Sequence, residues 1–330
     1  MKISIIGSGS WGTALAQVLA DNHHPVKIWG KNLDELVDIS KYHQNEKYFP
    51  GVKLNPSIQV VRQFKDAMDA DYILLAVPSE VIEDVCTQID QSINHDVIII
   101  NVAKGFHPTS HKRLSLVIRE AFKSHHLKDI VSLIGPSHAE EVVLRQLTVV
   151  NAVCENEESA KHIQTMFSNG YFRVYRSTDV VGSEIGVAVK NVIAIASGIL
   201  SGLGFGDNAR AALMTRGMAE ITRYGLFFGA KPDTFLGLTG MGDLIVTCTS
   251  VHSRNFQAGL TIGKENNARL FWETNTKTVE GVKAAKIVYE DAMKNGIDMP
   301  ITEAVYKVLY EEAKPSEVIE SLMKRALKSE

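Results

Sequence analysis

Lys190 stands in a part of the sequence where a charged side chain is unusual. Between Glu184 and Ser197, Lys190 and Asn191 are the only polar residues, and the run contains no proline. Such a segment predicts a helix that is buried on all faces. Burial removes the hydration of an ammonium group and favours the neutral amine unless a carboxylate or a substrate anion compensates. Lys190 is therefore a candidate acid–base group; in the alternative interpretation its head reaches the surface along its aliphatic stem.

Two other charged residues accompany glycines. Lys104 follows the apolar run 97–103 and precedes a glycine. We expect it at the carboxyl end of a strand, where ligands of parallel sheets bind, although a lysine in a surface turn would have the same neighbours. Asp243 is the one carboxylate in the glycine-rich segment 236–250, which we expect to interrupt the helices as a loop. Its carboxylate is suited to hold Lys190 and to stabilise the ammonium form.

Ser253, Arg254 and Asn255 form a polar block of three consecutive residues. A guanidinium fork beside a hydroxyl and an amide offers several donors to one phosphate group. The block is therefore a candidate phosphate clamp. The alternative is that Arg254 makes a structural salt bridge.

A glycine motif lies at the start of the chain. Residues 7–12 match G-x-G-x-x-G, between a β-branched run at 2–6 and an apolar helical pattern at 13–20. In a dinucleotide-binding turn, Gly7 makes the bend, Gly9 lets a pyrophosphate approach the backbone and Gly12 lets the helix pack on its strand. The amino end of the helix then offers N–H groups to the phosphates. A purely structural turn is the alternative.

The end of the second expected strand, 25–30, bears on the choice of coenzyme. NAD enzymes usually place Asp or Glu there to hold the ribose 2′-hydroxyl. This sequence continues Gly30-Lys31-Asn32 instead. Lys31 is suited to meet a 2′-phosphate, which favours NADP, unless it is only a solvated loop charge.

The elements that position these residues form two series. Apolar runs that alternate with helical segments predict a parallel sheet covered on both faces, an α/β fold of the Rossmann type. After Arg176 the patterns are helical, so we expect a dinucleotide-binding domain at 1–182 and an all-helical substrate and catalytic domain at 183–330. Further strands are expected at 72–78, 97–103, 130–135, 148–153 and 171–175, and helices at 183–197, 208–223, 280–295, 302–312 and 316–328.

Composition excludes several classes of protein. The 330 residues carry a net charge of −3, which gives no basic excess for nucleic acid or a membrane surface. The sequence contains no run of about 20 apolar residues, so we expect no membrane span. The apolar run at the start of the chain is too short for a signal peptide. The three cysteines are far apart in the sequence, which is typical of reduced thiols in a cytoplasmic protein. The histidines and cysteines lack the spacing of a metal site, and no nucleophile motif is present.

Taken together, these blocks resemble the bacterial NAD(P)-dependent glycerol-3-phosphate dehydrogenases. They occur in the order of that family and span nearly the whole chain. The blocks are Gly7–Ala14, Asn101–Gly105, Gly135–Ala139, Val189–Asn191, Gly240–Leu244, Ser253–Asn255 and Val279–Gly281.

The resemblance implies reversible reduction of dihydroxyacetone phosphate to sn-glycerol 3-phosphate for phospholipid synthesis, with NADP or NAD. It makes Lys190 the proton donor and acceptor, assisted by Lys104 and Asp243. The positions implied in substrate binding are Lys104, Gly135, Ser137, Lys190, Asn191, Asp243, Ser253, Arg254 and Asn255. Those implied in cofactor binding are Gly7, Gly9, Ser10, Trp11, Gly12, Lys31, Lys104, Ala139, Arg254 and Glu280.

Three positions depart from the family or vary within it. His138 stands where phenylalanine is usual and places a titratable ring near the cofactor. The segment 261–276 lacks the usual glycines, which leaves its conformation open. Position 31 varies, so the resemblance does not decide coenzyme preference. Oligomeric state and feedback inhibitors are also undecided, with a homodimer as the working expectation.

Two other functions remain open on the sequence. One is a β-hydroxyacid or 6-phosphogluconate type of dehydrogenase, which has a Rossmann domain with a helical partner. The other is a non-catalytic NADP sensor, against which the joint presence of Lys190, Lys104 and Asp243 argues. An assay of dihydroxyacetone phosphate against hydroxy acids separates the enzymes, and dinucleotide binding without hydride transfer would identify a sensor.

The coenzyme hypothesis gives a first prediction. NADPH should be used at least as well as NADH, and Lys31→Asp should shift preference towards NADH. The reason is that a carboxylate repels a 2′-phosphate and accepts a hydrogen bond from a free 2′-hydroxyl. The measurement is kcat/KM for each coenzyme, and an unchanged ratio would show that Lys31 does not contact the phosphate.

Overall fold

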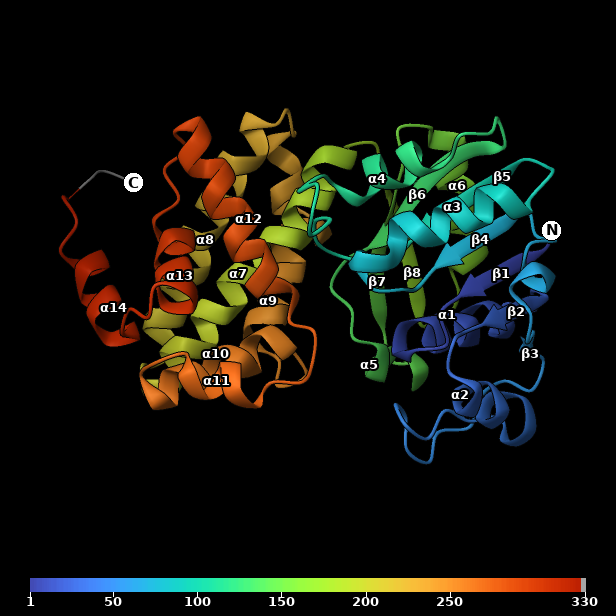
Figure 1. Ribbon diagram of the computed structural model, residues 1–330, viewed down its shortest axis with the longest axis horizontal. Coiled ribbons are helices and arrows are strands. Elements are labelled where there is room, and N and C mark those ends of the chain that lie inside the picture. The colour runs from blue at the N-terminus through green and yellow to red at the C-terminus, as the bar shows by residue number, and fades with distance from the viewer. Residues whose placement is uncertain (328–330) are drawn as a thin grey trace. The chain divides into compact units, whose positions relative to one another are not determined.

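The computed structural model describes residues 1–327 of the chain. It divides into two compact units, Met1–Val180 and the residues from Val181 onwards. Figure 1 shows that the first unit holds the sheet with its helices and that the second is made of helices. The expected helix end at Lys328 lies outside the described residues.

The sheet of the first unit has eight strands in the order β3-β2-β1-β4-β5-β6-β7-β8. The order of β3, β2, β1, β4 and β5 is that of doubly wound, dinucleotide-binding sheets. The strands are β1 Ile3–Ile6, β2 Val26–Trp29, β3 Gln59–Val60, β4 Tyr72–Leu75, β5 Val97–Asn101, β6 Leu127–Ile134, β7 Thr148–Val153 and β8 Phe172–Ser177.

Apolar side chains bury both faces of this sheet. Leu15 and Val18 belong to the cluster on one face, and Ile82, Ile89 and Ile118 belong to the cluster on the other. Helices α1, α5 and α6 cover the first face, and α3 and α4 cover the second, as Figure 1 shows. The helices of this unit are α1 Ser10–Asp21, α2 Leu33–Val37, α3 Ile82–Ser92, α4 Leu114–Ala121, α5 Ala139–Val143 and α6 Glu157–Phe167.

The expected α/β fold is confirmed, but one strand pair differs from the expectation. Strand β7 pairs with β6 in antiparallel orientation, whereas β8 pairs parallel with β7. The segment between β6 and β7 contains only the five-residue helix α5, so the chain turns back beside β6 instead of crossing over the sheet. The prediction of an entirely parallel sheet was therefore wrong at this pair.

The second unit is arranged around α7, which runs from Val180 to Gly202. This helix has the length and composition of a membrane span, but 89% of its most apolar window is buried inside the structure, as in a core helix. The other helices of the unit are α8 Asp207–Phe227, α9 Asp243–Thr249, α10 Arg254–Glu265, α11 Arg269–Thr274, α12 Glu280–Asn295, α13 Pro300–Tyr310 and α14 Pro315–Met323.

The glycine-rich segment is not the loop that the sequence suggested. A π-helical turn at Leu238–Gly242 leads directly into α9, whose first residue is Asp243. The segment 261–276 is also largely helical, since it contains the end of α10 and all of α11.

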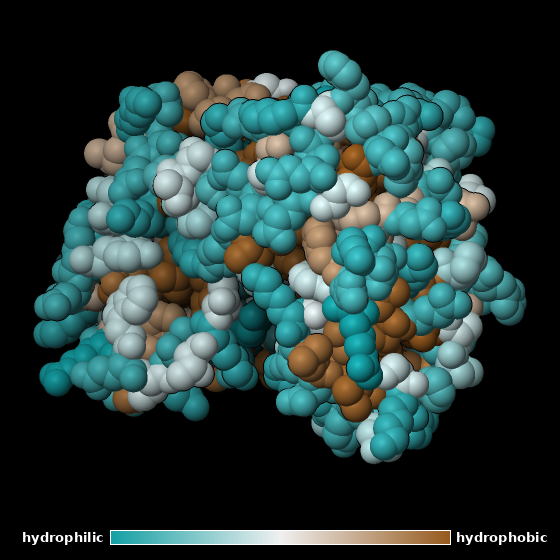
Figure 2. All heavy atoms as spheres, turned by 45° about the vertical axis from the view of Figure 1, so that its right-hand side comes forward, coloured by the Kyte–Doolittle hydropathy of each residue, from teal (hydrophilic) through white to brown (hydrophobic). Residues whose placement is uncertain are grey.

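On the face of the molecule in Figure 2, hydrophilic side chains predominate, and apolar ones show between them.

Asp21, the last residue of α1, joins several elements of the first unit. Burial alone would raise the pKa of its carboxyl group, but hydrogen bonds outweigh burial and lower the pKa to about 2. The four side chains that donate to this carboxylate are Gln17, Asn55, Arg145 and Tyr171. Arg145 adopts a left-handed backbone conformation, with φ 59°, and its guanidinium lies 2.8 Å from the carboxylate.

This network predicts a pH-dependent contribution to stability. Because the folded-state pKa of Asp21 is depressed, its contribution is present above the unfolded-state pKa and is lost as the pH falls towards 2. Asp21→Asn should lower the free energy of unfolding at pH 7 by ~2 kcal/mol, the usual loss for hydrogen bonds to a charged group. Urea unfolding should show the difference between the two proteins becoming smaller from pH 7 to pH 3 without vanishing, while the exposed control Asp84→Asn should resemble the wild type at both pH values. A difference in the free energy of unfolding that is the same at both pH values would show that the substitution acts through packing.

Candidate active site

The glycine turn between β1 and α1 has the shape of a phosphate cradle. Gly7 has φ +119°, and a Cβ on it would lie 2.3 Å from the carbonyl oxygen of Ala76. A Cβ on Gly12 would lie 1.8 Å from the carbonyl oxygen of Gly7. Above Gly9, in contrast, the nearest atom is the Tyr48 hydroxyl at 4.0 Å, so the backbone there is open to a ligand. No side chain caps the amino end of α1. The main-chain N–H groups there are suited to bind the pyrophosphate of a dinucleotide.

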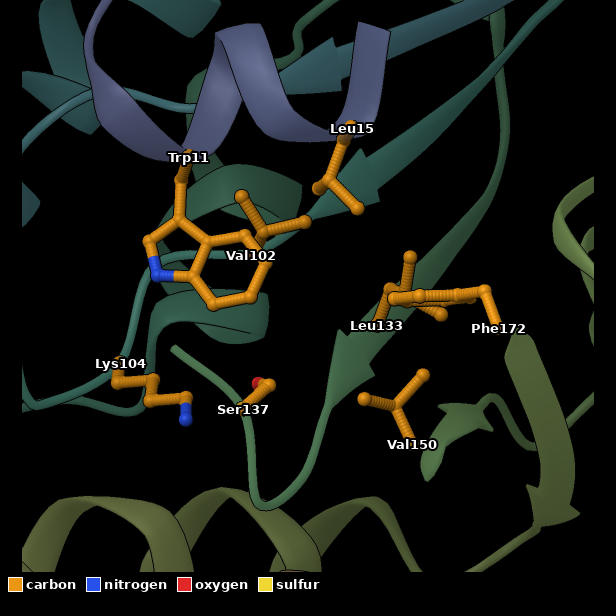
Figure 3. Close-up of a pocket in the computed structure, with 8 residues that line it drawn as sticks. All are labelled: Trp11, Leu15, Val102, Lys104, Leu133, Ser137, Val150 and Phe172. Atoms are coloured by element: carbon orange, nitrogen blue, oxygen red, sulfur yellow. The ribbon is translucent and has the colours of Figure 1, made fainter. Parts of the chain in front are cut away.

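A pocket in the same unit brings several predicted residues together (Figure 3). The Trp11 indole, the Lys104 ammonium and the Ser137 hydroxyl border one space. Lys104 Nζ and Ser137 Oγ donate to the carbonyl oxygen of Gly135 over 2.9 and 3.0 Å. The remaining lining is apolar and comes from Leu15, Val102, Leu133, Val150 and Phe172.

The other predicted residues of the sheet unit lie at element ends. Ser10 begins α1 and Ala139 begins α5, while the half-buried His138 precedes that helix. Lys31 follows β2 and is exposed. No hydrogen bond or ion pair of Lys31 occurs within residues 1–327.

Lys190 and Asp243 form a buried ion pair in the helical unit. Lys190 Nζ lies 2.6 Å from Asp243 Oδ1, and the two side chains are 4% and 1% exposed. The alternative in which Lys190 reaches the surface is therefore excluded. Removing an ammonium and a carboxylate from water is unfavourable for each alone, and close pairing with additional hydrogen bonds offsets that penalty.

Thr247 completes this site and was missed in the sequence. Lys190 Nζ donates to Thr247 Oγ1 over 2.6 Å, and the same hydroxyl donates to the main-chain carbonyl of Asp243 over 2.6 Å. The four-residue spacing from Asp243 would have indicated this contact if the segment had been assigned to a helix. Nearby, burial raises the pKa of the Cys248 thiol to about 12, which keeps it neutral beside the ion pair.

The polar block after α9 opens α10. Ser253 is the N-cap of this helix and accepts a hydrogen bond from the N–H of Phe256. Arg254, the first helical residue, is exposed, and no carboxylate partner for it occurs among the described residues. The salt-bridge alternative for Arg254 therefore finds no support within residues 1–327.

Asn255 and Asn191 have structural partners as well as predicted ligands. Asn255 Nδ2 donates to Asn191 Oδ1 over 3.0 Å, and Asn255 Oδ1 accepts from the N–H of Gly281 over 2.8 Å. Asn255 thus connects α7, α10 and the start of α12, where Glu280 is the first residue. Within the described residues, no group of three His, Cys, Asp or Glu side chains is placed to hold a metal ion.

Comparison with known proteins gives matches across the chain. Residues 2–160 match the family model for the N-terminus of NAD-dependent glycerol-3-phosphate dehydrogenase, and residues 179–320 match the model for its C-terminus. The chain is 47% identical to glycerol-3-phosphate dehydrogenase [NAD(P)+] of Bacillus cereus, covering 100% of this chain and 97% of that protein. It is 44% identical to the protein of that name from Streptococcus agalactiae, covering 100% and 98%.

Among solved structures, this chain resembles glycerol-3-phosphate dehydrogenase of Coxiella burnetii. The TM-score is 0.91 at 33% sequence identity, with 98% of this chain and 99% of that chain covered. The likeness therefore extends over both units.

Proposed function

Because this chain belongs to the family of NAD-dependent glycerol-3-phosphate dehydrogenases, we propose that it interconverts dihydroxyacetone phosphate and sn-glycerol 3-phosphate. The coenzyme is NADH or NADPH, and the product serves phospholipid synthesis. The observation that carries this proposal within the molecule is the buried ion pair of Lys190 and Asp243, held 2.6 Å apart. Full-length relatives named for this activity favour it over the hydroxyacid dehydrogenase and sensor alternatives.

Lys190 is the proton donor in the direction of reduction. A bound nicotinamide would supply the hydride, and the substrate oxygen at C2 would then need a proton. Asp243 and Thr247 fix the ammonium group by two contacts of 2.6 Å each, so its position does not depend on solvent. A general acid positioned in this way accelerates reactions by roughly 10²- to 10⁴-fold.

Lys104 and Ser137 are the substrate-binding residues that we assign within the sheet unit. Their shared hydrogen-bond acceptor, the Gly135 carbonyl, holds both side chains in the lining of one pocket. The Lys104 ammonium supplies positive charge for an oxygen on which negative charge develops. Trp11, in the same pocket, provides an apolar wall.

Arg254 and the amino end of α10 bind the substrate phosphate. Ser253 already accepts from a main-chain N–H, so its hydroxyl hydrogen remains directed to other acceptors. The exposed guanidinium of Arg254 has no carboxylate partner among the described residues, and Asn255 Nδ2 has a second hydrogen beyond the one given to Asn191. These donors are suited to a phosphate dianion.

The cofactor residues that we propose are as follows. Gly7, Gly9, Ser10, Trp11 and Gly12 hold the pyrophosphate side, and Lys31 contacts the adenosine side. Lys104, Ala139, Arg254 and Glu280 are the remaining contacts. We assign coenzyme binding to residues 1–182 and substrate binding with proton transfer to residues 183–330. The three buried free cysteines support a cytoplasmic location, and we propose a homodimer as the assembly.

The proton-donor assignment predicts the effect of Lys190→Met. The variant should retain NADPH binding and lower kcat by on the order of 10²-fold or more, because the general acid is lost while the coenzyme residues remain. Lys264→Met, on exposed α10 surface, should turn over normally. Turnover of Lys190→Met at the wild-type rate would transfer the role to Lys104.

The phosphate assignment predicts a substrate-dependent effect of Arg254→Ala. Losing one charge-assisted contact costs roughly 2–4 kcal/mol, so kcat/KM for dihydroxyacetone phosphate should fall by ~30- to 1000-fold. Unphosphorylated dihydroxyacetone should be affected far less, and the exposed control Arg269→Ala should match the wild type on both substrates. Equal losses on both would mean that Arg254 acts on the coenzyme or the fold, which parallel measurement of NADPH affinity distinguishes.

A further inference from the structure

The end of β2 lacks a carboxylate in the sequence, but the structure brings one to it. A Cβ on Gly30, directly after β2, would lie 2.1 Å from Ser8 Oγ, so the Ser8 side chain fills the space of a residue-30 side chain. Ser8 Oγ donates to Glu35 Oε2 over 2.7 Å, and Glu35 is buried. The Glu35 carboxylate therefore lies beside the place where an acid at the end of β2 would lie.

Local structure fixes Glu35 in this position. Asn32 is the N-cap of α2, and its Oδ1 accepts from the N–H groups of Asp34 and Glu35. The cap sets the first turn of α2, and Ser8 sets the direction of the Glu35 side chain. The carboxylate thus belongs to the glycine turn as much as to its own helix.

Two more polar groups converge on the second oxygen of this carboxylate. Glu35 Oε1 lies 2.8 Å from Lys47 Nζ and 3.2 Å from the Tyr48 hydroxyl. The Tyr48 hydroxyl is also the nearest atom to the open space above Gly9. The Lys47 side chain is 58% exposed, and Glu35 raises its pKa. An anion and a cation therefore lie together at the border of the proposed coenzyme site.

We propose that the Glu35–Lys47 ion pair sets the balance between NADH and NADPH binding, an inference that rests on the proposed function. The carboxylate accepts from a ribose 2′-hydroxyl and repels a 2′-phosphate, while the ammonium attracts that phosphate. With both present, the charges largely cancel and either coenzyme is admitted. Removing one member leaves the other to act alone.

The test compares two variants that leave opposite charges behind. Glu35→Gln, nearly isosteric, should lower the ratio of the NADPH to the NADH dissociation constant by about 5- to 10-fold, and Lys47→Met should raise it by a similar factor. Dissociation constants are measured without substrate, from the fluorescence of the bound reduced nicotinamide at fixed ionic strength. Thermal unfolding confirms that each variant is folded.

Asp34→Asn, in the same first turn of α2, and Lys53→Met, on exposed surface, serve as matched controls that keep the wild-type ratio. Equal weakening of both coenzymes in both variants would show that the pair is structural only and would overturn the inference. Wild-type protein that binds neither coenzyme would overturn the proposed function along with it. Opposite shifts in the two variants are the supporting result.

Discussion

The helical unit depends on placing an ammonium and a carboxylate in its interior, where the two side chains are only 4% and 1% exposed. Each charge alone would be strongly unfavourable there, and replacing one partner typically costs 3–5 kcal/mol because the other is left uncompensated. The packing around the pair reflects this constraint. A Cβ on Gly186 would lie 2.5 Å from the carbonyl oxygen of Thr239, so α7 and the π-helical turn are in close contact, and Asp243 follows three residues after Gly240 in that turn.

The sheet unit meets a different constraint, because its proposed ligand is large and carries its own charge. Its groups are main-chain atoms and side chains at strand ends, where a parallel sheet leaves room for ligands. Gly9 offers open backbone, and Lys104 and Ser137 share one carbonyl acceptor at the pocket. Such a preformed surface suits a coenzyme that binds and dissociates. Proton transfer instead needs a proton donor that is held in an enclosed position.

The sequence predicts what depends on local pattern and misses what depends on distant partners. The burial of Lys190 followed from its apolar neighbours, and the glycine turn from its spacing. The orientation of β7 did not follow, because apolar composition does not encode strand direction. Asp243 was assigned to a loop because glycines are weak helix formers. As a result, the helical spacing that brings Thr247 to the same site was not recognised. Glu35 gave no signal because its partner Ser8 is 27 residues away.

Two of the molecule's lysine–carboxylate pairs, Lys190–Asp243 and Lys47–Glu35, show how burial changes the role of the same chemistry. Lys190 and Asp243 are almost wholly enclosed, so their attraction is strong and their separation is unfavourable. Lys47 is more than half exposed although Glu35 is only 7% exposed, so water and salt reach the ammonium and screen its attraction to the carboxylate. A lysine that solvent reaches is free to exchange its partner for a ligand group. Enclosure therefore suits the first pair to chemistry on a fixed atom, and the exposed lysine suits the second to discrimination between ligands of different charge.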